Sequence, residues 1–100
     1  MLATINPTEI YVPQVTQQYN TDVLIQMWLY GKAQTTVKSY RRVINRFFNF
    51  IGHSEIIAVN LMELQDWSLS LEGLKENTRR TYMNIVKSLL TFSHKLGYWY

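Results

Sequence analysis

Residues 36–51 read TVKSYRRVINRFFNFI, and this stretch decides the fold class. At about 100° per residue, its apolar side chains share one side of a helix, and its basic and amide side chains share the other. The apolar side holds Val37, Tyr40, Val43, Ile44, Phe47, Phe48, Phe50 and Ile51. The polar side holds Lys38, Arg41, Arg42, Asn45, Arg46 and Asn49. The pattern predicts an amphipathic helix that is capped by Thr35 or Thr36, ends at Gly52 and covers a core.

Three other segments repeat their apolar residues at helical spacing, so we expect four helices. The first predicted helix along the chain begins with Thr21 as its N-cap, has Asp22 in its first turn, and ends at Gly31. The third begins at Asn60, with Glu63 placed to complete a capping box. Their apolar faces hold Leu24, Ile25, Trp28 and Leu29 in one case and Leu61, Leu64, Trp67, Leu71 and Leu74 in the other.

The last predicted helix starts near Asn77 or Thr78 and runs to Gly97. Its apolar face holds Tyr82, Ile85, Val86, Leu89, Leu90, Phe92 and Leu96. Its polar face holds Arg80, Asn84, Lys87, Thr91, His94 and Lys95, with Arg79 at the border. No stretch alternates with a period of two, so no strand is expected. Four helices with short connections predict an all-α bundle around one core.

The composition is that of one folded domain. The chain has 100 residues, and 47% of them are hydrophobic, which is enough for one modest core. It has no cysteine, which excludes disulfides and thiolate chemistry and fits a reducing, cytoplasmic location. No apolar run approaches the ~20 residues that span a bilayer, and residues 1–19 lack the pattern of a secretory signal. Both prolines fall within residues 1–20, which we interpret as a flexible leader.

The charges are distributed unevenly. Of the ten Lys and Arg residues, four lie between Lys38 and Arg46 and four between Lys75 and Lys87. Five of the seven acidic residues lie between Glu55 and Glu76. A solvated helix face usually mixes signs, because opposite charges four residues apart stabilise the helix. Two unmixed basic faces therefore indicate an external anion as partner, with plain solvated surface as the alternative.

The sequence offers no catalytic constellation and no metal motif. His53 follows the predicted stop at Gly52, and His94 lies on the polar face of the last helix. Neither has a carboxylate or nucleophile in a recognisable pattern, and there is no His-x3-His pair or Gly-rich phosphate loop. Tyr40 and Tyr82 lie on apolar faces and are interpreted as packing residues. We therefore expect no catalytic residue, no metal and no cofactor.

Five runs carry a resemblance to a known family by their order and spacing. They are DVLIQMWL (22–29), TVKSYRRVINRF (36–47), LMELQDW (61–67), TRRTYMNIVKSLLTF (78–92) and KLGY (95–98). In this order the chain resembles the N-terminal core-binding domain of tyrosine recombinases, the phage-integrase family, over about residues 21–98. The resemblance implies an orthogonal four-helix bundle of the SAM-like type that serves DNA recombination and integration.

In that family, the second and fourth helices of this domain face the major groove, and the domain and a catalytic domain together clamp duplex DNA. Carried over by position, the resemblance implies DNA contacts from two helices, which agrees with the two basic faces. The candidates are Thr36, Lys38, Ser39, Arg41, Arg42, Arg46, Thr78, Arg79, Arg80, Asn84 and Lys87.

The family's catalytic residues belong to its second domain, so the resemblance implies that this chain is not itself an enzyme. Residues 99–100 are expected to start the linker to that absent domain, in either a truncated integrase or a natural short protein. The expected partners are double-stranded DNA and other recombinase protomers on DNA, with no membrane and with a monomeric isolated domain. The alternative is a helical protein–protein interaction domain that docks through Tyr98, Trp99 and Tyr100.

Overall fold

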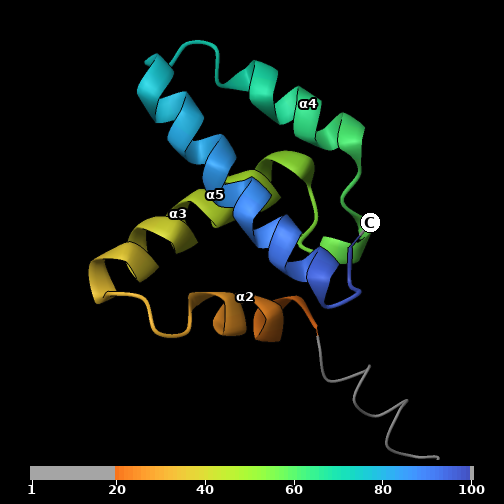
Figure 1. Cartoon of the computed structure of the whole chain (residues 1–100). Coiled ribbons are helices and arrows are strands. Elements are labelled where there is room, and N and C mark those ends of the chain that lie inside the picture. Colours follow the sequence, from red (N-terminus) through yellow and green to blue (C-terminus); the bar gives the residue numbers. More distant parts are fainter. Residues whose placement is uncertain (1–19, 100) are drawn as a thin grey trace, which may run out of the picture.

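The computed structural model describes residues 20–99, whose helices follow one another as Figure 1 shows. The elements are α2 (Thr21–Leu29), α3 (Gln34–Ile51), the 3₁₀ turn η1 (Ile56–Ala58), α4 (Leu61–Ser70) and α5 (Glu76–Lys95). Residues 20–99 contain no strand, so the predicted all-α class is confirmed. The predicted leader lies, except for Asn20, outside the described residues, and so does Tyr100.

The start of α2 differs from the prediction by one residue. Asn20, not Thr21, is the N-cap, and its side-chain oxygen accepts a hydrogen bond from the Val23 amide at 2.9 Å. The Thr21 hydroxyl instead accepts from the backbone amide of Ile56 at 3.2 Å, which ties α2 to η1. The predicted stop is close to the observed one, since α2 ends at Leu29 and Gly31 has a φ of 83°.

The starts of α3 and α5 are also earlier than predicted. The N-caps are Ala33 and Lys75, and neither makes a side-chain cap bond. The prediction of Thr35 or Thr36 as the cap of α3 is therefore wrong, and α5 begins at Glu76, one or two residues before the predicted start near Asn77 or Thr78. The chain enters each helix before it reaches these side chains, because the carbonyls of Ala33 and Lys75 already accept the first helical hydrogen bonds.

Three other predicted ends are confirmed or nearly so. Gly52 closes α3 in the left-handed conformation, with a φ of 85°, as its lack of a Cβ permits. Asn60 and Glu63 form the predicted capping box at the start of α4. The helix α5 ends at Lys95, two residues before Gly97, which has a φ of 84°.

The core lies where α3 packs against α4 and α5, and α5 also packs against α2 (Figure 1). The ring of Phe47 meets the indole of Trp67 edge to face at 5.0 Å, and Trp28 stacks on Tyr40 at 5.3 Å. Ser93 is fully buried, and its hydroxyl is satisfied by donating to the Leu89 carbonyl at 2.9 Å. These contacts join all four helices into one packed unit.

Four residues that were predicted on apolar, core-facing stripes are instead exposed. They are Phe50, Leu61, Leu74 and Leu96. Leu74 and Leu96 lie beyond the last residues of α4 and α5, so helical spacing no longer sets their direction. Phe50 is about 100° from the centre of the buried stripe of α3, and Leu61 is the first residue of α4.

The aromatic end of the chain packs onto the domain. The indole of Trp99, which was expected to begin a linker, donates its N–H to the Val59 carbonyl at 2.8 Å. Tyr98 and Trp99 are both half-buried against the core. Only part of the surface of these two side chains is therefore exposed for the protein–protein docking that was the alternative prediction. Among the described residues, no helix combines the length and apolarity needed to cross a membrane.

Candidate nucleic-acid interface

The polar face of α3 carries charges of one sign. Lys38, Arg41, Arg42 and Arg46 are exposed, and α3 itself contains no acidic residue. The ion pairs within residues 20–99 join His53 to Glu63 and Arg80 to Glu76, so neither involves α3. The positive charge of α3 is therefore not neutralised by the described part of the molecule.

These cations are spread over the width of the face. Arg41 and Arg46 are five residues apart, so they lie about 140° apart around the helix axis. Lys38 and Arg42 lie between them, and the exposed Ser39 lies on the same side of the helix as Arg46, about 10 Å before it along the axis. A partner that contacts one narrow line along the helix reaches only part of this set, whereas a partner that covers a little over a third of the helix circumference reaches all of it.

One contact joins α3 to α5 at this surface. The guanidinium of Arg46 lies over the ring of Tyr82, 5.4 Å from its centroid, which is a cation–π geometry. Thr78 and Arg79 precede Tyr82 by about one turn, and both are half-buried, as expected for the side of α5 that faces α3. Thr78 and Arg79 therefore lie on the same side of α5 as Tyr82, the residue that Arg46 contacts.

The other α5 candidates form a separate, outward stripe. Arg80, Asn84 and Lys87 are exposed and follow a spacing of four and three residues along one face. Arg80 donates to the Glu76 carboxylate at 3.1 Å and to the Asn77 side chain at 3.4 Å. The predicted start near Asn77 or Thr78 would leave Glu76 outside the helix, which is wrong. Because α5 starts at Glu76, this acid lies one turn before Arg80 and pairs with it.

The two threonines that were expected at helix starts lie in the first turns. Thr36 and Thr78 are each the third residue of their helix, so their backbone N–H groups precede the first intrahelical bond. The first turn of α3 contains no acid, whereas that of α5 contains Glu76. The start of α3 is therefore the more favourable of the two for an anion.

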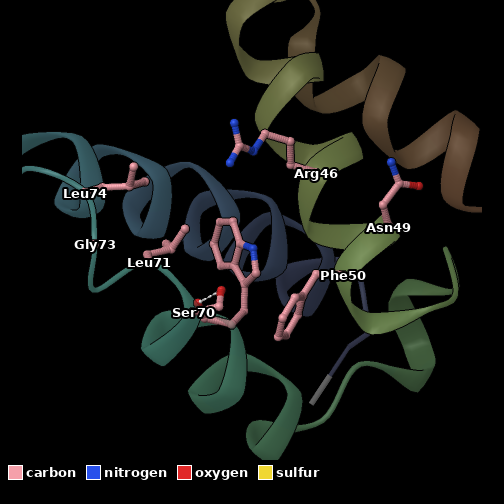
Figure 2. A pocket seen from close by; sticks show the side chains of 8 residues that line it. Arg46, Asn49, Phe50, Ser70, Leu71, Gly73 and Leu74 are labelled. Carbon is pink, nitrogen blue, oxygen red and sulfur yellow. Dashed lines mark hydrogen bonds between the residues drawn. The ribbon is translucent and has the colours of Figure 1, made fainter.

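A hollow of about 570 Å³ lies between α3 and the end of α4, and Arg46 is part of its lining. Figure 2 shows Arg46, Asn49 and Phe50 projecting from α3 on one side, with Ser70, Leu71 and Leu74 on the other. Its lining within the described residues includes no acid, and the Ser70 hydroxyl is engaged with the Trp67 carbonyl at 2.6 Å. The hollow thus leaves the charge of Arg46 unopposed on that side too.

His53 has a carboxylate partner that sequence reasoning missed. Its Nδ1 accepts from the Glu55 amide at 3.2 Å, so Nε2 carries the hydrogen and donates to the Glu63 carboxylate at 3.0 Å. Glu63 also closes the capping box at Asn60, so the pair ties the loop after α3 to the start of α4. Local spacing could not reveal it, because the two residues lie in different elements.

The remaining candidates for chemistry have structural partners. His94 lies on the polar face of α5, and its Nδ1 is 2.8 Å from the Trp99 carbonyl oxygen. Tyr40 and Tyr82 are half-buried against the core. Across residues 20–99, no group of three His, Cys, Asp or Glu side chains is arranged to hold a metal.

Comparison with protein-family models gives no match, and neither do searches of curated proteins and of solved structures.

Proposed function

We propose that this chain is a DNA-binding module that grips duplex DNA with the polar faces of α3 and α5. The observation that carries the proposal is the α3 face, where four cations are exposed and no ion pair within the described residues involves them. Polyanions are the partners that such a face fits, because lysine and arginine release counterions when they neutralise phosphates.

The width of the face favours a duplex. The major groove of B-DNA admits an α-helix, and its walls are the two phosphate backbones. With α3 in the groove, Arg41 and Arg46 point to opposite walls, because they lie about 140° apart. Lys38 and Arg42 lie between them and point to base edges, where arginine can bond guanine in a bidentate manner.

The second helix adds contacts to the same duplex. The Arg46–Tyr82 contact fixes the junction of α3 and α5. In this proposal Thr78 and Arg79, on the Tyr82 side of α5, contact the DNA backbone, and the exposed Arg80, Asn84 and Lys87 extend the contact outward along α5. Thr36 and Ser39 supply hydroxyls at the edge of α3.

The resemblance of the sequence to the core-binding domain of tyrosine recombinases supports a more specific role. In that role the four helices form an orthogonal, SAM-like bundle, and the module serves site-specific recombination or integration in the cytoplasm. Strand cleavage is then the task of a separate catalytic domain, so the module itself binds DNA without catalysis. Its other partners are recombinase protomers bound to the same DNA, and the isolated module is monomeric.

A protein–protein interaction module is the second candidate, and α4 favours it. Met62 and Leu69 expose 68% and 61% of their surface, and they lie on the same side of α4, seven residues apart. Isolated exposed apolar residues are ordinary, but two on one helix face suit a partner helix.

A titration of labelled duplex by fluorescence anisotropy tests the DNA-binding proposal. The double substitution Arg42→Ala and Arg80→Ala is expected to weaken binding by about 1–3 kcal/mol for each arginine that bonds a base or is bidentate to phosphate. A matched control replaces two exposed glutamines on other helices, Gln26→Ala and Gln65→Ala, and is expected to bind as the unaltered chain does. If the arginine variant also binds unchanged, these faces do not bind DNA.

A further inference from the structure

A second cluster of basic and hydroxyl side chains lies at the far end of α5, outside the candidate DNA-binding residues. It lines a hollow of about 400 Å³ between the end of α2, the loop that follows it and the last turns of α5. Lys32 comes from the loop, and Ser88, Thr91 and Lys95 come from α5. Two amines from different elements therefore line one concave surface together with two hydroxyls.

Two polar side chains of this hollow, Lys32 and Ser88, are linked by a series of contacts. The ammonium of Lys32 lies 5.8 Å from the centroid of the Tyr40 ring, and that ring stacks on Trp28 at 5.3 Å. The indole N–H of Trp28, a buried residue, donates to the Ser88 hydroxyl oxygen at 3.0 Å. Lys32 and Ser88 are thus positioned by the same pair of aromatic rings.

This arrangement leaves the Ser88 hydroxyl free to donate. Its oxygen already accepts the indole N–H, so its hydrogen must point elsewhere. The buried Ser93 and the exposed Ser70 donate to backbone carbonyls of their own helices, but no such bond is formed by Ser88 in the described chain. Thr91 lies one turn further along α5, and its side chain is exposed.

The electrostatics of the hollow favour an anion. No acidic residue of the described chain lines it, and no ion pair within residues 20–99 engages Lys32 or Lys95. The nearest acid in sequence on α2 is Asp22, which is six residues before Trp28 and so about 9 Å away along the helix. Two amines and two hydroxyl donors around one concave site are the groups that a phosphate oxyanion requires.

We infer that Lys32, Ser88, Thr91 and Lys95 form a phosphate-binding site, and that its occupant is a backbone phosphate of the duplex bound along α5. This inference rests on the proposed function. Lys87, Thr91 and Lys95 continue the outward stripe of α5 at spacings of four residues. From Lys87 to Lys95 the helix rises about 12 Å, which corresponds to three or four base-pair steps. The site therefore extends the DNA contact beyond the residues already proposed.

Duplexes of two lengths test the inference with the whole chain. One spans about one helical turn, and the other is about half a turn longer. The unaltered chain is expected to bind the longer duplex several-fold more tightly. The double variant Lys32→Gln and Lys95→Gln is expected to bind both duplexes equally. For this variant, the slope of log affinity against log salt should fall by about 0.9 for each phosphate that is no longer neutralised.

Two further variants separate binding from structure. The variant Lys32→Arg and Lys95→Arg keeps both charges and is expected to keep the length advantage. Both lysines also lie at or just beyond helix C-termini, where a cation stabilises the fold, so thermal unfolding is measured in parallel. If the glutamine variant unfolds at a lower temperature but still binds the longer duplex more tightly than the shorter one, the lysines have only that structural role, and the inference is overturned.

A titration with inorganic phosphate tests the site without DNA. In amide NMR spectra of the unaltered chain, phosphate is expected to shift the signals of Lys32, Ser88 and Thr91, and Ser88→Ala is expected to reduce these shifts. Shifts confined to other residues would overturn the site. If neither duplex binds but phosphate shifts these three residues, the proposed DNA function fails, and the site binds a small phosphate instead of a DNA backbone.

Discussion

The helices α3 and α5 have the same kind of amphipathic sequence, but their charged faces are built differently. The four cations of α3 lie on a helix without a single acid, and no ion pair within residues 20–99 involves them. The basic stripe of α5 begins with a carboxylate, and Glu76 holds Arg80 at 3.1 Å. Similar basic patterns in the sequence therefore have different outcomes: the cations of α3 have no ion-pair partner within residues 20–99, whereas Arg80 of α5 is paired with Glu76.

The difference assigns unequal roles to the two helices. An arginine that is already paired must exchange a protein carboxylate for a phosphate, whereas an unpaired one exchanges only water and counterions. The pair of Arg80 is well solvated, with 61% of the arginine side chain and 75% of the glutamate side chain exposed, so its strength is small. We therefore expect α3 to supply most of the affinity and α5 a smaller share.

The largest effect is expected in the core that both faces share. Phe47 is fully buried and meets Trp67 edge to face, so Phe47→Ala removes a ring at the centre of the fold. The free energy of unfolding should fall by about 3–5 kcal/mol, as measured by chemical denaturation. DNA binding by α3 and by α5 should weaken together. A fall below about 1 kcal/mol would mean that the two helices do not depend on this packing.

The next effect compares one arginine from each face. Arg42→Ala should weaken duplex binding by about 1–3 kcal/mol, because Arg42 is central in the α3 face and outside both ion pairs of residues 20–99. Arg80→Ala should weaken it less, because the unaltered Arg80 is shared with Glu76. Anisotropy titrations of both variants at one salt concentration make the comparison. A larger loss from Arg80→Ala would reverse the roles of the two helices.

A smaller effect is expected where the two faces meet. Tyr82→Leu removes the ring beneath the Arg46 guanidinium but keeps an apolar side chain against the core. A double-mutant cycle with Arg46→Ala should give a coupling of about 0.5–1 kcal/mol in unfolding free energy. A coupling of zero would mean that Arg46 is not positioned by Tyr82.

The smallest effect has the opposite sign. Glu76→Gln frees Arg80 and removes a negative charge from the α5 stripe, so duplex binding should become tighter by less than about 1 kcal/mol at low salt. The same change should lower helix stability by about 0.3–0.5 kcal/mol, because an i,i+4 pair is lost. Asp66→Asn on α4 removes an acid from another face and is the control for net charge. Equal tightening in both variants would show that only net charge matters.

Local patterns made much of the fold predictable. The separation of apolar and basic residues in 36–51 predicted α3, and Gly52 and the Asn60–Glu63 box marked two helix ends that the structure confirms. Each of these features depends on residues within one or two turns of one another. The exposure of Leu74 was not predictable in this way, because it depends on where α4 stops.

The candidate interface was predictable only in part. Periodicity identified the basic residues, but a one- or two-residue error in the start of α5 hid the pairing of Glu76 with Arg80. Contacts between distant segments had no local signal at all. The bond between Trp28 and Ser88 joins residues 60 positions apart, and it is what positions one wall of the proposed phosphate site.

The most direct test of the central claim is an amide NMR titration of the chain with a short duplex. The claim predicts that shifts cluster on residues 36–46 and 78–87, that they are larger on α3 than on α5, and that Met62 and Leu69 on α4 are unaffected. Shifts that cluster on α4 instead, or that leave residues 36–46 unchanged, would contradict it.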